Sequence, residues 1–280
     1  MYFFAKTIYT DSKENEGEYL MKEFLKTYYK TLIFFAVIGL VGGFFSGLYV
    51  LDAYPAELQA QLSDELNAAG LGGFPIDILM GVITAFQSAG YGAVLGAAGI
   101  WLSKKVGLWK DERSITKKPL IASVIVAVLG GAVMILSDIL FFGNYSEVIM
   151  NSYATKPTLI YMLATVTYGA VIEEVMLRLF LMSLIVFLIH KIFAKTQEKP
   201  VTAILIIANV IAAILFAAGH LPATLLLIGN SPIIIARCFL LNGGLGLLFG
   251  MLYRKYGLRY AMIAHGGCHI VSKLIWILFI

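Results

Sequence analysis

Long apolar runs separated by short polar segments organise this chain. A membrane-spanning helix needs about 20 predominantly apolar residues, and seven runs are long enough for one helix each: 31–51, 76–103, 119–142, 161–190, 201–228, 232–253 and 259–280. The fourth run stays apolar almost to Phe193, and the fifth contains Gly219 and Pro222, where we expect a helix break. The pattern predicts an all-α polytopic transmembrane helical bundle of about seven to eight spans.

Composition supports a membrane protein. The chain is 60% hydrophobic and 14% charged, with a mean hydropathy of +0.85, whereas soluble domains carry roughly 25% charged residues. The lipid bilayer is therefore an expected partner, and a net charge of +4 does not indicate nucleic acid. Cys238 and Cys268 both lie in apolar runs, which predicts helix packing and not a disulfide scaffold. We expect no cleavable signal peptide, since the first apolar run begins near Thr31.

The basic residues divide unequally between alternate loops. One set of segments carries 17 Lys and Arg: 1–30, 104–118, 191–199 and 254–259. The alternate loops carry one, Lys156: 52–75, 143–160 and 229–231. Because Lys and Arg accumulate on the cytoplasmic side, we predict a multi-pass cell-membrane protein with a cytoplasmic N-terminus. Arg237, near the start of its span, is expected to extend to the external interface.

An acidic pair and an arginine interrupt the apolar run from Tyr161 to Phe193. Glu173, Glu174 and Arg178 are its charged residues before Lys191, and each charge placed at mid-membrane costs about 2.5–3.5 kcal/mol on insertion scales. Glu174 and Arg178 are four residues apart and share a helix face, while Glu173 projects about 100° away. An ion pair that locks neighbouring helices is the alternative, but it accounts for one carboxylate only.

Three histidines also lie in apolar runs. His220 follows the expected break, and His265 and His269 are four apart on one helical face. Each could be a hydrogen-bonded core residue, but an imidazole beside buried carboxylates also suits proton transfer near neutral pH. With Glu173 the same histidines form a ligand set that zinc accepts, although the H-E-x-x-H motif is absent.

The order and spacing of these residues resemble the motifs of the CPBP intramembrane proteases. This family includes the type II CAAX prenyl proteases and the bacteriocin-processing, Abi-type proteins of bacteria. The matching motifs are Glu173-Glu174-x-x-x-Arg178, Phe216-x-x-x-His220 and His265-x-x-x-His269. The resemblance covers roughly residues 160–280. It departs from the family at His269, where Asn is common.

The resemblance implies a glutamate-dependent hydrolysis in a bacterial cytoplasmic membrane. Glu173 and His220 would activate water, Glu174 and Arg178 would position the site, and His265 would help to hold the oxyanion. Because His269 replaces an amide, it would add a pH dependence to the last motif. The ligand set does not demand a metal, so no cofactor is favoured, with a divalent metal such as zinc as the alternative.

These inferences predict an intramembrane endopeptidase that cuts a peptide or a membrane-protein substrate. The alternatives are a non-catalytic membrane partner or immunity protein with a degenerate protease site, and a transporter with a proton relay, which the lack of internal repeats disfavours. We divide the chain into an amphipathic cytoplasmic segment (1–30), the first transmembrane helices (31–150) and a CPBP-like catalytic transmembrane region (151–280).

Simple straight spans do not bring the predicted site together. At about 1.5 Å per residue, His265 lies ~9 Å from the cytoplasmic end of its run and His220 lies ~28 Å from its own. A bend at Gly219 and Pro222, a re-entrant segment or a shifted boundary is therefore required.

Overall fold

The computed structural model describes residues 2–111, 114–194 and 196–280, and the side chains of the first helix from Tyr19 onward. The amphipathic character predicted for residues 1–30 thus lies partly outside the described residues. Within them the chain is helical and has no strand. The all-α prediction is confirmed.

The helices follow one another with short connections. The α-helices are α1 (Tyr2–Ala53), α2 (Ala56–Ala68), α3 (Ile76–Gly90), α4 (Gly96–Lys105), α5 (Lys117–Leu140), α6 (Glu147–Ser152), α7 (Leu159–Ala164), α8 (Ser183–Phe193), α9 (Thr202–Leu227), α10 (Pro232–Cys238), α11 (Gly244–Tyr256) and α12 (Leu258–Phe279). The π-helical stretches are η1 (Tyr91–Leu95), η3 (Thr165–Glu173), η4 (Val175–Met182) and η5 (Phe239–Gly243), and η2 (Phe142–Tyr145) is a 3-10 helix.

Six helices of the described chain are long and apolar enough to cross a membrane: Tyr19–Ala53, Ile76–Lys105, Lys117–Tyr145, Thr202–Leu227, Pro232–Tyr256 and Leu258–Phe279. The remaining predicted span is helical throughout, from Leu159 to Phe193, as α7, η3, η4 and α8. The expected helix break at Gly219 and Pro222 is wrong, because α9 continues through both residues. Membrane helices tolerate an internal proline when other groups satisfy the freed backbone.

Glycines let α1 approach the rest of the bundle closely. A Cβ atom at Gly39 or Gly47 would lie 2.5 Å from a backbone oxygen of α3, that of Ser88 or Met80. Lipid offers little hydrophobic driving force between helices, so close van der Waals packing of this kind holds membrane helices together. On its other side α1 packs against α7 and η3. The first hairpin therefore supports the helix that carries Glu173.

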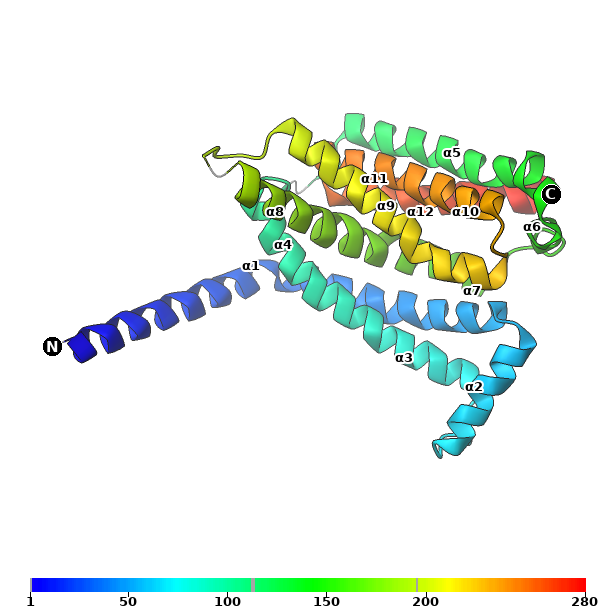
Figure 1. Cartoon of the computed structure of the whole chain (residues 1–280), viewed down its shortest axis with the longest axis horizontal. Coiled ribbons are helices and arrows are strands. Elements are labelled where there is room, and N and C mark those ends of the chain that lie inside the picture. Colours follow the sequence, from blue (N-terminus) through cyan, green and yellow to red (C-terminus); the bar gives the residue numbers. More distant parts are fainter. Residues whose placement is uncertain (1, 112–113, 195) are drawn as a thin grey trace.

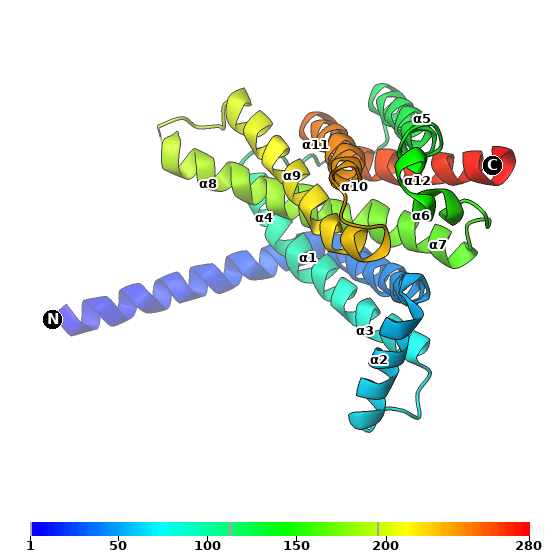
Figure 2. The same ribbon diagram turned by 45° about the vertical axis from the view of Figure 1, so that its right-hand side comes forward.

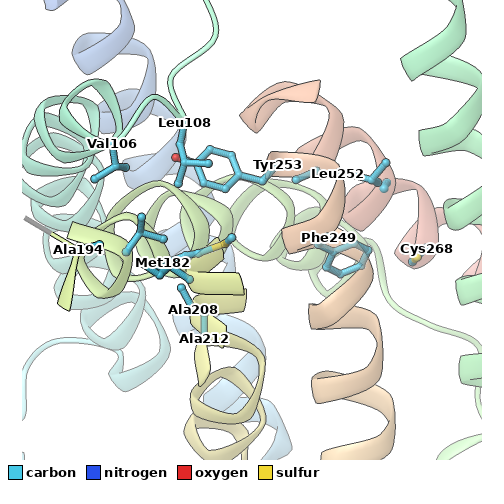
Figure 3. Close-up of a cluster of buried hydrophobic side chains, with 14 residues drawn as sticks. Val106, Leu108, Met182, Ala194, Ala208, Ala212, Phe249, Leu252, Tyr253 and Cys268 are labelled. Atoms are coloured by element: carbon cyan, nitrogen blue, oxygen red, sulfur yellow. The ribbon is translucent and has the colours of Figure 1, made fainter. Parts of the chain in front are cut away.

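A cluster of buried apolar side chains joins the helices of the second half of the chain (Figure 3). Its members come from η4, α8, α9, α11 and α12 and from the connections that follow α4 and α8. The labelled ones are Val106, Leu108, Met182, Ala194, Ala208, Ala212, Phe249, Leu252, Tyr253 and Cys268. Small side chains on α9 meet large ones on α11, which brings these two helices together beside η4.

The helices that carry His220 and His265 end at different levels, which explains how two residues at unequal distances from their helix ends meet. In Figures 1 and 2, α8 and the first turns of α9 extend beyond the ends of α11 and α12 on the same side of the bundle. Residues at different distances from their helix ends consequently reach the same level. α9 and α12 are each a single continuous helix, so neither contains a re-entrant segment.

Candidate active site

Two adjacent glutamates lie where two π-helical stretches meet. η3 ends at Glu173 and η4 begins at Val175. π-helical turns have i→i+5 hydrogen bonds and occur frequently at functional sites. Small residues of η3 allow α12 to approach, because a Cβ at Gly266 would lie 3.0 Å from the Cβ of Ala170. The local backbone thus directs both carboxylates towards α12 and its neighbours.

Glu174 and Arg178 form a buried ion pair, as their spacing predicted. Arg178 Nη1 lies 3.0 Å from Glu174 Oε1, and the exposed fractions of the two side chains are 1% and 0%. Arg178 Nη2 also donates to the carbonyl of Gly246 at 3.0 Å. The guanidinium lies 4.7 Å from the ring centroid of Phe216, a cation–π contact. Arg178 therefore links η4 to α9 and α11.

Glu174 also orients His265. The Nδ1 atom of His265 lies 2.9 Å from Glu174 Oε1, and an ionised carboxylate only accepts hydrogen bonds. Nδ1 is consequently the donor, and Nε2 faces the second carboxylate, 3.9 Å from Glu173 Oε2. The ring of Phe249 stacks on the imidazole at 4.6 Å and 18°. Sequence reasoning missed Phe249, because one Phe among many apolar residues gives no signal.

Glu173 lies between two imidazoles. Its Oε1 is 3.9 Å from His220 Nε2, and 17% of the Glu173 side chain is exposed. The Nδ1 atom of His220 lies 2.9 Å from the carbonyl of Phe216, which can only accept, so Nδ1 is the donor. In neutral His220 the Nε2 lone pair then points to the side of Glu173. Both nitrogen–oxygen distances exceed direct hydrogen-bond length.

His269 lies beside this group without joining its hydrogen bonds. Its ring centroid is 5.1 Å from that of His265, and its buried Nδ1 has no hydrogen-bond partner in the described protein. Across the described ranges, no group of three or more His, Cys, Asp or Glu side chains is arranged to hold a metal ion. The structure brings Glu173, Glu174, Arg178, His220 and His265 together and places His269 at their edge.

A second polar cluster corrects the prediction for Arg237. Instead of extending to the interface, Arg237 donates through Nε and Nη2 to Asp138 Oδ1 and Oδ2, each at 2.6 Å. The hydroxyl of Tyr153 donates to the same carboxylate at 2.8 Å. Burial and the nearby Asp138 raise the pKa of Tyr153 above its ordinary value. The partners lie in different helices and loops, so no sequence spacing indicated the pair.

The segment that forms this site is similar to a known protein family. Residues 155–271 match the family model described as type II CAAX prenyl endopeptidase Rce1-like. Comparisons with curated proteins and with solved structures found no match. The matched segment contains all six residues of the predicted site and confirms the resemblance inferred from their motifs.

Proposed function

On the premise that residues 155–271 belong to the type II CAAX prenyl endopeptidase Rce1-like family, we propose that Glu173 and His220 activate water to hydrolyse a peptide bond. The family is one of proteases, and the chain is a multi-pass membrane protein with apolar helices. The observation that carries the proposal is the position of Glu173 between two imidazole Nε2 atoms, each 3.9 Å away.

Water fits the separation between Glu173 and His220. A molecule about 2.8 Å from each atom spans 3.9 Å with normal hydrogen bonds. One water proton then points to the Glu173 carboxylate and the other to His220 Nε2, which leaves an oxygen lone pair for a substrate carbonyl. Positioned bases of this kind contribute typically about 10²–10⁴-fold to a rate.

The proposed reaction returns the proton that it takes. Glu173 accepts a proton as the water oxygen bonds to the carbonyl carbon. When the carbon–nitrogen bond breaks, Glu173 gives that proton to the leaving amine. His265 is held by Glu174 and donates from Nε2 to the oxyanion when its ring is protonated. Glu174 and Arg178 act as positioning residues, because Glu174 holds His265 and Arg178 holds Glu174.

No metal is part of this proposal. His220 and His265 each use Nδ1 for an internal hydrogen bond, and their Nε2 atoms are assigned to water and oxyanion. A zinc site built from Glu173, His220, His265 and His269 is the competing arrangement. It would require His269 to turn towards Glu173, whose ion-pair contacts in the described chain are with the other two histidines.

The test is cleavage of a peptide library by the purified, detergent-solubilised protein. We expect cleavage that Glu173→Ala and His220→Ala abolish and that a chelator leaves unchanged. Loss with chelator and recovery with zinc would establish the metal arrangement instead. Activity retained by both variants would contradict the mechanism, and no cleavage in any sample would favour a non-catalytic membrane partner.

The proposed orientation places the N-terminus and the basic loops in the cytoplasm. Single introduced cysteines test it, because native Cys238 and Cys268 are buried. A cysteine at Lys110 should react with an impermeant maleimide in inverted membrane vesicles, and one at Glu57 in right-side-out vesicles. The opposite pattern would reverse the orientation.

A further inference from the structure

Gln87 is a polar side chain on the exposed surface of α3, within a predicted membrane span. The other exposed residues from Ile78 to Val94 are apolar or glycine. Gln87 donates through Nε2 to the hydroxyl of Tyr91 at 2.7 Å. A side-chain amide has a second N–H and a carbonyl oxygen, and hydrocarbon offers neither of them a hydrogen-bond partner. This pair is therefore suited to face a polar group other than the surrounding lipid chains.

Tyr168 lies one helical turn before Glu173. The two residues are five apart in η3, and the i→i+5 hydrogen bonds of a π-helix place such residues on the same face. The hydroxyl of Tyr168 interacts electrostatically with the Glu173 carboxylate and with Tyr91, and it has no hydrogen-bond partner among the described residues. A phenol both donates and accepts hydrogen bonds. Tyr168 thus offers an unused hydroxyl near the proposed base.

Close packing on α1 fixes the helices that carry these groups. A Cβ at Gly42 of α1 would lie 2.6 Å from the backbone nitrogen of Tyr168 in η3. A Cβ at Gly92 of η1 would lie 2.5 Å from the carbonyl oxygen of Phe35 in α1. Such close backbone approach holds membrane helices together. α1 therefore fixes the positions of Tyr91 and Tyr168 relative to each other.

Gln87, Tyr91 and Tyr168 together form a polar strip that leads to Glu173. Each of the three is exposed or partly exposed, and so is Glu173. All three side chains are neutral at pH 7, so the strip does not select an opposite charge. Neutral donors and acceptors match the main-chain amides of a peptide, which need hydrogen-bond partners when they leave water. The strip therefore has the chemistry of a site for peptide main chain.

We propose that the polar strip binds main-chain amide groups of the peptide substrate beside the cleaved bond. The inference rests on the proposed peptidase function. It adds two binding residues, Gln87 and Tyr91, from outside the segment 155–271 that matches the family model. Tyr168 contacts the amide nearest to Glu173, and the Gln87–Tyr91 pair contacts an amide further along the peptide. Because side chains of the peptide take no part in these bonds, the strip holds a substrate without selecting its sequence.

Two substitutions test the proposal with the purified protein and the peptide that wild type cleaves best. Tyr168→Phe removes the hydroxyl and keeps the ring, and Gln87→Leu removes the amide. Each should raise KM about 3- to 10-fold, the effect of one hydrogen bond, and leave kcat within about twofold. Thermal unfolding of Tyr168→Phe should be unchanged, because the hydroxyl has no protein partner to lose. Tyr145→Phe, at an exposed tyrosine of η2, is the matched control and should keep the wild-type KM.

Peptides that contain one ester test the main-chain contacts directly. In each peptide one amide other than the cleaved bond is replaced by an ester, which removes an N–H donor and weakens the carbonyl acceptor. One or two positions near the cleaved bond should raise the KM of wild type about 3- to 10-fold. The same ester should have little effect on the variant, Tyr168→Phe or Gln87→Leu, that has already lost the partner of that amide. Fluorescence anisotropy with Glu173→Gln gives the Kd of each labelled peptide without turnover.

The outcomes distinguish this inference from the function on which it rests. A wild-type KM in both Tyr168→Phe and Gln87→Leu, or ester effects of equal size in wild type and variants, would overturn the main-chain site and leave the peptidase standing. A fall in kcat of Tyr168→Phe without a change in KM would also overturn it, and would assign the hydroxyl to the chemical step. Lack of Glu173-dependent cleavage of every peptide would overturn the peptidase function itself.

Discussion

The described part of the chain buries two carboxylate–arginine pairs, which differ in how many of their polar atoms form hydrogen bonds. Asp138 receives two short bonds from Arg237 and a third from Tyr153. In the other pair, Glu174 contacts Arg178 through one oxygen, and its Oε2 has no hydrogen-bond partner in the described protein. Both oxygens of Asp138 thus accept hydrogen bonds, whereas one oxygen of Glu174 accepts none from the described protein.

The surroundings of the two pairs differ in the same sense. Beside Glu174 lies Glu173, a second carboxylate with two imidazoles at 3.9 Å. No second carboxylate pairs with Arg237 among the described side chains. Buried ion pairs contribute little net stability but are costly to break. An ion pair whose carboxylate oxygens all accept hydrogen bonds is typical of a structural role. Buried polar atoms without partners beside titratable groups are typical of a catalytic site.

The largest expected effect concerns Glu173. Glu173→Gln should lower kcat by about 10³–10⁴-fold, because the amide cannot accept the water proton. The midpoint of thermal unfolding should change little, since the carboxylate is partly exposed and lies 3.9 Å from its nearest ionic partners. Glu147→Gln, on the exposed surface of α6, is the matched control. A variant that cleaves at the wild-type rate would contradict the catalytic role of Glu173.

Arg178 should matter most for stability. Arg178→Met leaves the buried Glu174 without its cationic partner and with the hydrogen bond from His265 alone, which costs about 3–5 kcal/mol of unfolding free energy. The measurement is thermal or denaturant unfolding in detergent, with exposed Lys255→Met as control. Adding Glu174→Gln to the same protein should recover part of the loss, because the uncompensated charge is then gone. A double variant less stable than Arg178→Met would show that the uncompensated charge of Glu174 is not the cause of the loss.

The sequence predicted the features of this molecule that depend on the spacing of nearby residues. Seven apolar runs correspond to long helical segments, and the four-residue step from Glu174 to Arg178 correctly predicted that these two side chains share a helix face. The family motifs added the order of His220 and His265. These features depend on helix periodicity and on the cost of charge in lipid, both of which act within a few turns.

Relations between distant segments could not be predicted in this way. Asp138 and Arg237 pair across 99 positions, and nothing in either run indicates a partner. The unequal extension of α8 and α9 beyond α12 depends on how whole helices pack. The expected break at Gly219 and Pro222 relied on local propensity, which the bundle overrides.

Asp138 tests the cluster that it forms with Arg237 and Tyr153. Asp138→Asn should cost about 2–3 kcal/mol of unfolding free energy, because Arg237 loses its charged acceptor and Tyr153 loses part of its own. The protein that remains folded should keep the wild-type kcat, since no residue of this cluster contacts Glu173. Exposed Asp64→Asn serves as control. A fall in kcat of the fully folded variant would assign the cluster of Asp138, Arg237 and Tyr153 a role in catalysis.

Tyr153 should give a smaller effect with a defined pH range. Tyr153→Phe removes one hydrogen bond to a charged acceptor and should cost about 1.5 kcal/mol. Because the folded-state pKa of Tyr153 is raised, its contribution is fully present below the unfolded pKa of about 10. It is lost as pH rises through the folded pKa. Unfolding measurements should show a constant difference between wild type and variant at pH 7–9 and a decline above pH ~10.

His269 should produce the smallest change of all. His269→Asn introduces the residue that resembling proteins commonly have, and both side chains can donate a hydrogen bond. The His269 ring lies at the edge of the site, 5.1 Å from His265, and its Nδ1 has no protein partner to lose. We therefore expect kcat/KM within about tenfold of wild type, a difference below ~1.4 kcal/mol, measured with the peptide that wild type cleaves best. A loss approaching that of Glu173→Gln would show that His269 takes part in the reaction. The Nδ1 atom without a protein partner would then be the structural feature that indicated this role.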